Sequence, residues 1–181
     1  VLFTSSLRLN LTTPDTSLAA GDNATISQPV EGYNFQRIAQ REFTASFWVK
    51  STVTGTYSAS FRNSGVDRSY VSNFTIAAAN TWEKKTITVP ASPSAGTWNY
   101  TNGIGLYVSI TLATGTTFHT TANVWQTGNF LGTASNPNGV NTGATDFRIV
   151  GVEVDPGSVA TEFEMVDIEA EFSAAQRYYW K

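Results

Sequence analysis

Residues 103–112 read Gly-Ile-Gly-Leu-Tyr-Val-Ser-Ile-Thr-Leu, and this stretch decides the fold class. Every second residue from Ile104 to Leu112 is a branched aliphatic, whereas the residues between them are small or polar apart from Tyr107. Successive side chains of a β-strand point to opposite faces of a sheet, so a period of two predicts a strand with one buried face. Because this alternation is the cleanest in the chain, we expect a central strand.

Other strand-like segments follow at intervals of about ten residues, separated by turn-forming residues. The predicted strands are 1–11, 24–28, 43–50, 55–62, 70–77, 85–89, 117–125, the apolar run of 146–154 that ends at Asp155-Pro156-Gly157, and 158–164. This rhythm is typical of a sandwich, because each short strand crosses one layer and then turns back. The predicted fold is therefore an all-β, antiparallel two-sheet β-sandwich (jelly roll), with a short helix or coil over 168–179.

The alternation also predicts which side chains are buried. In the segment 43–50, one face carries Phe43, Ala45, Phe47 and Val49, and the other carries Thr44, Ser46, Trp48 and Lys50. Near the N-terminus, the leucines at 7, 9 and 11 should form the buried face of a strand. The predicted core includes Phe43, Phe47, Leu106, Val108, Ile110, Ile149 and Val152.

Length and charge limit the classes of function. A chain of 181 residues can bury the core of one domain, 1–181, without disulfides, and it contains no cysteine. Its net charge of −3 and its lack of a basic stripe argue against nucleic acid as a partner. No apolar run is long enough to insert into a membrane. Because the chain opens at Val1, we expect it to be processed or to be part of a longer protein.

Several patches give the chain a resemblance to a known family. The end of the sequence carries Gly151-Val152, Gly157-Ser158-Val159-Ala160-Thr161, Phe163-Glu164 and Gln176-Arg177-Tyr178-Tyr179, and upstream lie Gln28, Glu31-Gly32 and Ser46-Phe47-Trp48-Val49-Lys50. In order and spacing they resemble the C-terminal jelly-roll domains, similar to carbohydrate-binding modules, of bacteriophage tail-fibre and related phage structural proteins. The sequence departs from that family at Glu153-Val154-Asp155-Pro156, where "Q-L-E-x-G" is more frequent.

The resemblance implies a non-enzymatic virion domain from the C-terminal part of a longer fibre or other appendage. It implies a homotrimer, with the aromatic residues Tyr178, Tyr179 and Trp180 as contacts between copies. Its partners would then be other virion proteins and a glycan or protein of the host cell surface. Two alternatives remain open: a carbohydrate-binding module of a secreted glycoside hydrolase, and a capsid or head-decoration jelly roll.

Catalytic and metal-binding patterns are weak. The single histidine, His119, lies in a threonine-rich segment predicted to be an exposed strand. Glu162 and Glu164 are same-face neighbours that a glycosidase could use, but they alternate with apolar residues as a solvated strand face does. No Asp-rich calcium loop is present. We therefore predict no enzyme activity, no cofactor and no metal.

Aromatic residues supply the predicted binding site. Rings in loops can stack on sugars while neighbouring amides bind the hydroxyls, although such a ring can also simply pin its loop to the sandwich. The residues predicted to bind ligand are Trp98, Tyr100, Trp125, Asn99, Gln126 and Asn129, beside the loop tip at 134–143. Trp48 and Trp82, which lie in or beside strands, are predicted to be packing residues at the core or its edge.

Overall fold

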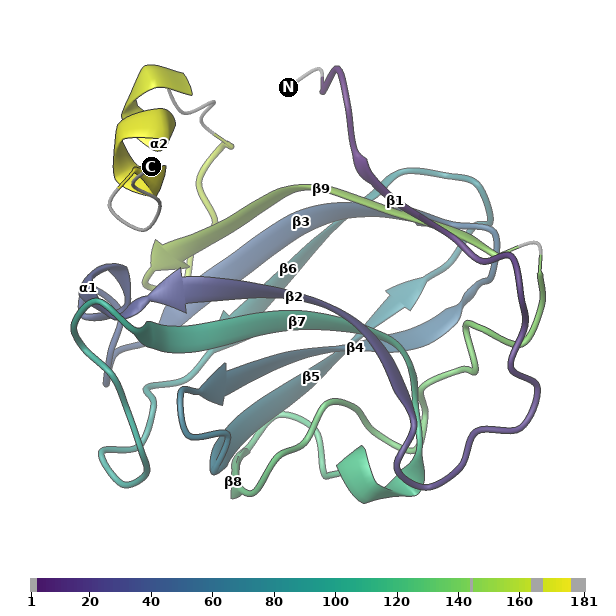
Figure 1. The fold of residues 1–181 in the computed structure, drawn as a ribbon, viewed down its shortest axis with the longest axis horizontal. Helices are drawn as coiled ribbons and strands as arrows, with labels where there is room; N and C mark the ends of the chain where they lie inside the picture. The colour runs from purple at the N-terminus through teal and green to yellow at the C-terminus, as the bar shows by residue number, and fades with distance from the viewer. Residues whose placement is uncertain (1–2, 144, 164–167, 177–181) are drawn as a thin grey trace.

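A computed structural model describes residues 3–143, 145–163 and 168–176 of the protein. Within them, two antiparallel sheets pack face to face, and Figure 1 shows the two layers. The first sheet has four strands in the order β1-β9-β3-β6. Their bounds are β1 Leu7–Asn10, β9 Asp146–Pro156, β3 Phe43–Ser51 and β6 Glu83–Val89.

The second sheet has five strands in the order β2-β7-β4-β5-β8. Their bounds are β2 Asn23–Glu31, β7 Ile104–Thr114, β4 Gly55–Asn63, β5 Arg68–Ile76 and β8 Trp125–Thr127. Residues 104–112, with the cleanest alternation in the sequence, lie in β7, which pairs with β2 on one side and β4 on the other. The predicted jelly-roll sandwich with a central strand at 103–112 is therefore confirmed.

The core lies between the sheets, where the period-two pattern placed it. Six of the seven predicted core residues are buried, and the seventh, Val152, packs against them while partly exposed. Aromatic rings join the layers: Phe47 of β3 meets Phe74 of β5 edge-on with ring centroids 5.1 Å apart, and Phe43 meets Phe61 of β4 in the same way at 5.5 Å. Such T-shaped pairs stabilise a core beyond the apolar area they bury.

A β-bulge interrupts β9 beside β3. Ser46 of β3 pairs with Glu153, and Trp48 pairs with Val150, so one residue of β3 faces two residues of β9. Gly151, within the bulge, has φ +61°, a left-handed conformation that glycine adopts without steric cost. Before the bulge the core-facing residues of β9 have odd numbers, Phe147 and Ile149, and after it they have even numbers, Val152 and Val154. The strand β9 therefore contacts the core on both sides of the bulge.

Two predicted strands are absent from the described residues. Residues 117–125 form the end of a 3₁₀ turn, η1 Thr116–Phe118, an irregular segment, and only the first residue of β8. Residues 158–163 are irregular, and Glu164 lies outside the described residues. The chain turns after Pro156 as predicted, and Gly157 has φ +89° there. In both segments hydrogen bonds of turns and side chains, such as those from Thr161 to Asp155, take the place of a strand ladder.

The N-terminal strand is shorter than predicted, and its leucines are not buried. β1 covers only 7–10, Leu7 is 55% exposed, and Leu9 is also exposed. β1 is an edge strand that pairs only with β9, and alternation alone cannot tell a face that meets the other sheet from one that meets solvent.

Two short helices complete the described chain. α1 Gly32–Phe35 follows β2, and α2 Ile168–Ala175 lies on the side of β9 away from the five-stranded sheet (Figure 1). The helix predicted over 168–179 thus exists in part. Tyr178, Tyr179 and Trp180, the predicted trimer contacts, lie outside the described residues. Among those that are described, no helix has the length and apolarity to cross a membrane.

Replacement of Phe47 by alanine should lower the free energy of unfolding by about 3–5 kcal/mol, because it leaves a cavity between the sheets. Leu7→Ala is the matched control, since Leu7 is an exposed leucine that the sequence pattern had placed in the core. We expect it to cost less than about 0.5 kcal/mol. Urea unfolding monitored by fluorescence measures both values, and similar losses for the two variants would contradict the placement of β1.

Candidate functional site

The three predicted ligand-binding aromatics gather at one edge of the sandwich. Trp98 and Tyr100 stack on the buried Phe35 ring at centroid distances of 5.2 and 5.9 Å. Trp125 meets Trp98 edge-on at 5.9 Å and also contacts Tyr70 at 5.6 Å. The structure therefore brings these residues together, and each ring is partly buried against the core cluster.

We call Trp98, Tyr100 and Trp125, together with the loops that carry them, the loop cluster. Most of its polar atoms already make hydrogen bonds within the protein. The indole N–H of Trp98 donates to the Ala95 carbonyl, and that of Trp125 donates to the Pro90 carbonyl, both at 3.0 Å. Asn99 Oδ1 accepts from the backbone N–H and hydroxyl of Thr101. These bonds hold the loops in place and leave few free donors or acceptors on the rings themselves.

The other two amides predicted to bind ligand lie elsewhere on the five-stranded sheet. Asn129 accepts a hydrogen bond of 2.8 Å from Arg62, whose guanidinium lies over the Tyr107 ring. Burial lowers the pKa of Arg62 from its ordinary value. Gln126 lies in β8 opposite Ser69. The residues after β8 fold back over the outer face of this sheet, where Thr111 donates to the Leu131 carbonyl at 2.7 Å.

The predicted loop tip at 134–143 also packs on its own protein. Asn136 donates to the Thr111 carbonyl at 3.0 Å, and Asn138 donates to the Asp15 carbonyl at 2.9 Å. Gly139 is buried against Leu112, to whose carbonyl its N–H donates at 3.0 Å. The assignment of the tip and of the six side chains as a ligand site stays a prediction.

A network centred on Asn63 fixes the loop that carries Trp98. The side chain of this buried residue donates to Asp67 and to the Thr97 carbonyl, and it accepts from the N–H groups of Asp67 and Arg68. Asp67 in turn accepts from the backbone N–H and hydroxyl of Thr97. The hydrogen bond from Asn63, followed by those from Thr97, lowers the pKa of Asp67, so its carboxylate stays ionised near neutral pH.

A second aromatic surface lies on the outer face of the four-stranded sheet, which we call the outer groove. It has a volume of about 610 Å³, within the roughly 300–1,000 Å³ range of ligand sites. Its lining residues are Phe3, Thr4, Ser5, Ser6, Arg8, Trp48, Trp82, Arg148 and Val150. Sequence reasoning missed this surface by assigning Trp48 and Trp82 to packing, although the alternation in β3 had already placed Trp48 opposite the core-facing residues.

The two tryptophans of the outer groove differ from those in the loops. Trp82 is 37% exposed, and Trp48 is half-buried. Neither indole N–H makes a hydrogen bond to another described residue, in contrast to those of Trp98 and Trp125. Lys50 lies 5.4 Å from the Trp82 ring centroid and contacts the ring as a cation–π partner. Both side chains therefore present ring surface and a free donor.

Backbone contacts of the loop before β6 position Trp82. The Glu83 carboxylate accepts from the N–H groups of Ala77 and Ala78, each at 2.9 Å, and also from Lys85. The N–H of Asn80 donates to the Ser51 carbonyl of β3 at 2.8 Å. Hydrogen bonds from Lys85 first, and then from Ala78, lower the pKa of Glu83. The loop is thus tied to β3 beside Lys50.

The N-terminal segment forms one side of the outer groove and rests on the bulge of β9. A Cβ atom at Gly151 would lie 2.5 Å from Phe3 Cζ, so glycine is needed for the ring to approach the strand. Phe163 also meets Phe3, edge-on with ring centroids 5.3 Å apart. Because Phe3 packs at this position, the residues that follow it, Thr4, Ser5 and Ser6, line the groove with their hydroxyls.

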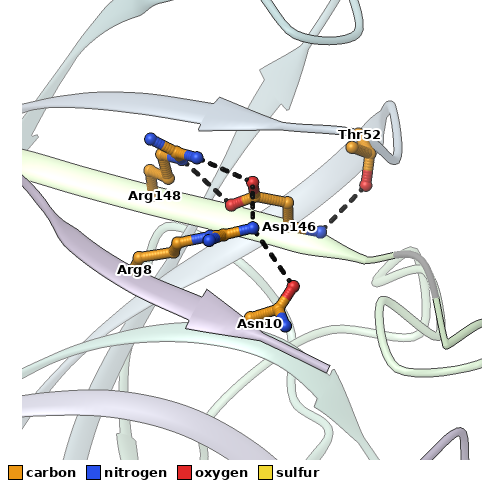
Figure 2. Close-up of polar contacts among 5 residues, drawn as sticks. All are labelled: Arg8, Asn10, Thr52, Asp146 and Arg148. Carbon is orange, nitrogen blue, oxygen red and sulfur yellow. Dashed lines mark hydrogen bonds and ion pairs between the residues drawn. The ribbon is translucent and has the colours of Figure 1, made fainter. Parts of the chain in front are cut away.

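An ion-pair cluster lies at one end of the outer groove. Figure 2 shows Asp146 between two guanidinium groups: Arg148 donates Nε and Nη2 to it at 3.0 and 2.9 Å, and Arg8 Nη2 lies 3.1 Å from Oδ2. The backbone N–H of Asp146 donates to Thr52 Oγ1 at 3.0 Å, and its backbone carbonyl accepts from the Thr52 N–H at 3.1 Å. Hydrogen bonds from Arg148 and then Arg8 lower the pKa of Asp146 from 3.8 to about 2.

The weak catalytic candidates do not assemble a site among the described residues. His119 is half-buried beyond η1, and its ring nitrogen lies 3.0 Å from the Thr114 carbonyl. It is therefore neither in a strand nor exposed, contrary to the sequence prediction. Glu162 is exposed, and Glu164 lies outside the described residues. No cluster of three or more potential metal ligands occurs in the described part of the chain.

Comparison with known proteins assigns the chain to no family. No family model matches the chain, and no curated protein matches it. A solved structure described as "CBM4 structure and function" aligns with 11% identity and a TM-score of 0.42, over 84% of this chain and 94% of that one. A likeness of this size shows neither family membership nor function.

Gly151→Ala should destabilise the protein more than Gly157→Ala. Both residues have positive φ, so alanine costs roughly 1–2 kcal/mol of backbone strain at each. Only at Gly151 would the new Cβ also displace a neighbour, the Phe3 ring, because a Cβ at Gly157 has no atom within 4 Å. Urea unfolding measures the difference, and equal losses would show that Phe3 does not rest on the bulge.

The Asp146 cluster should stabilise the fold in a pH-dependent way. The pKa of Asp146 is lower in the folded protein, about 2, than its ordinary value of 3.8, so its stabilising contribution is complete above the ordinary value and is lost as pH falls towards 2. Wild type should therefore be more stable than Asp146→Asn at pH 7, and the two free energies of unfolding should converge below about pH 4. A difference that stays constant between pH 5 and pH 2.5 would contradict this assignment.

Proposed function

We propose that the protein is a non-catalytic carbohydrate-binding domain and that the outer groove is its binding site. The observation that carries the proposal is the pair of tryptophans, Trp48 and Trp82, which present exposed ring surface and unpartnered indole N–H groups in a groove lined with hydroxyls. The apolar CH face of a sugar ring stacks on such a surface, and its hydroxyls need donors and acceptors nearby.

The size and chemistry of the groove support a short glycan segment over a larger partner. A cavity of about 610 Å³ accommodates a small ligand, whereas a stable protein interface buries roughly 800 Å² on each partner. The hydroxyls of Thr4, Ser5 and Ser6 and the guanidinium groups of Arg8 and Arg148 surround the rings with polar groups that can bind sugar hydroxyls. The CBM4 likeness is compatible with this proposal but adds nothing to it.

The loop cluster, whose aromatic residues were predicted from the sequence to bind ligand, is a second candidate surface for carbohydrate binding. Trp98, Tyr100 and Trp125 lie together, but ligand would have to stack on rings that already contact Phe35, Tyr70 or one another. The outer groove is favoured because its tryptophans carry no such ring partners among the described residues.

The virion context rests on the sequence resemblance alone. If the domain belongs to a phage fibre or other appendage, weak glycan contacts would gain strength from three copies that act together on a host surface. Light scattering tests the proposed homotrimer, because a trimer has three times the 19.6 kDa chain mass. A monomer at micromolar concentration would favour the alternative of a binding module from a secreted glycoside hydrolase.

A glycan array with the purified protein tests the proposed function, followed by titration calorimetry on the strongest hit. Trp82→Ala should weaken binding about five- to thirtyfold, because a stacked ring contributes roughly 1–2 kcal/mol. The double variant Trp98→Ala, Trp125→Ala is the matched comparison at the loop cluster, and its fold is checked by circular dichroism. If only the double variant loses binding, the site lies in the loops, and the absence of any glycan hit would refute the function.

A further inference from the structure

The positive charges of the outer groove form a row across three neighbouring strands. Arg8 of β1 pairs directly with Arg148 of β9, and Arg148 pairs directly with Lys50 of β3. Like charges placed opposite each other in adjacent strands are destabilising, so a row of three cations is unfavourable unless something compensates it. Lys84, which pairs with Trp48 in β6, adds a fourth cation on the same face of the sheet, outside the groove lining.

Asp146 compensates only part of this charge. It is the carboxylate in ion-pair contact with the row, and it binds both Arg8 and Arg148. Its low pKa keeps it ionised, so three cations face one anion and a net positive charge remains in a protein whose total charge is −3. The other described carboxylates of this face, on Glu153, Asp155 and Glu162, lie beyond Trp48, at the far end from the row.

Donors of the row remain available to a ligand. Arg148 uses Nε and Nη2 for Asp146, and Arg8 uses Nη2 for both Asp146 and Asn10. Arg148 Nη1 and Arg8 Nε and Nη1 take part in none of these contacts, which Figure 2 shows for the five residues of the cluster. The side chains are 51% exposed for Arg8 and 31% for Arg148, and both line the groove.

We propose that the outer groove binds acidic glycans: the tryptophans stack on a sugar ring while Arg8 and Arg148 bind an anionic substituent of the glycan. This inference rests on the proposed function and names its ligand class. Planar guanidinium groups match the paired oxygens of a carboxylate or a sulfate, and hydrogen bonds between ions are about twice as strong as neutral ones. The anion would also relieve the repulsion within the row.

Two matched pairs of polysaccharides test the charge requirement. Polygalacturonate is compared with its methyl ester, and dextran sulfate with dextran, so that only the anionic group changes and carboxylate is distinguished from sulfate. We expect the charged member of at least one pair to bind at least about tenfold tighter in affinity electrophoresis and calorimetry. The affinity for the charged polysaccharide should fall as NaCl is raised from about 50 to 300 mM. Salt screens the attraction between exposed charges, with a screening length of about 10 Å at 0.1 M.

Two arginine variants test the site. Arg8→Gln leaves the bidentate pair of Arg148 and Asp146 intact and should weaken binding of the charged polysaccharide roughly three- to tenfold. Arg37→Gln makes the same change of charge at an exposed arginine beyond α1, and it should have no effect. Asp146→Asn should strengthen binding, since it removes the competing carboxylate, provided that circular dichroism shows a native fold.

The outcomes separate this inference from the proposed function. Equal affinity for charged and neutral partners, or equal effects of Arg8→Gln and Arg37→Gln, would overturn the acidic-glycan inference. If neutral polysaccharide still binds and Trp82→Ala abolishes that binding, the proposed function stands without the preference for anions. If no polysaccharide or array glycan binds, both proposals fail.

Discussion

The bulge at Gly151 is the constraint on which the four-stranded sheet depends. Phe147 and Ile149 point into the core, so an unbroken alternation would point Glu153 there as well, and an unpaired carboxylate in the core is strongly unfavourable. The extra residue instead turns Val152 and Val154 inward and Glu153 outward. The same glycine leaves room for Phe3, so one backbone feature shapes both the core and one side of the outer groove.

Much of the fold could be predicted because a buried strand face leaves a period of two in the sequence. The pattern found β7 and both faces of β3, and it found core residues on each side of the bulge. It failed for Leu7, where alternation on an edge strand does not reveal whether a face meets the other sheet. It failed for 117–125, where hydrogen bonds from turns and side chains replace the ladder of a strand.

The site was less predictable because it depends on register between distant segments. Arg8, Lys50 and Arg148 become neighbours only when β1, β3 and β9 pair as they do, and no local pattern specifies that pairing. Trp98 and Trp125 illustrate the opposite difficulty. Their loop positions suggested exposure, but the carbonyls of Ala95 and Pro90 that bind their indoles are not identifiable from local sequence.

The two aromatic surfaces also differ in what ligand binding would change. In the loop cluster the rings already gain roughly 0.5–1.5 kcal/mol from each aromatic contact, so the fold is stable there without ligand. In the outer groove the row of cations lowers stability, and Asp146 offsets only part of the repulsion. A ligand that binds the folded state alone stabilises it by mass action. The contacts through which an anionic ligand binds the cations would therefore also stabilise the folded protein. The cations favour ligand binding but lower the stability of the protein without ligand.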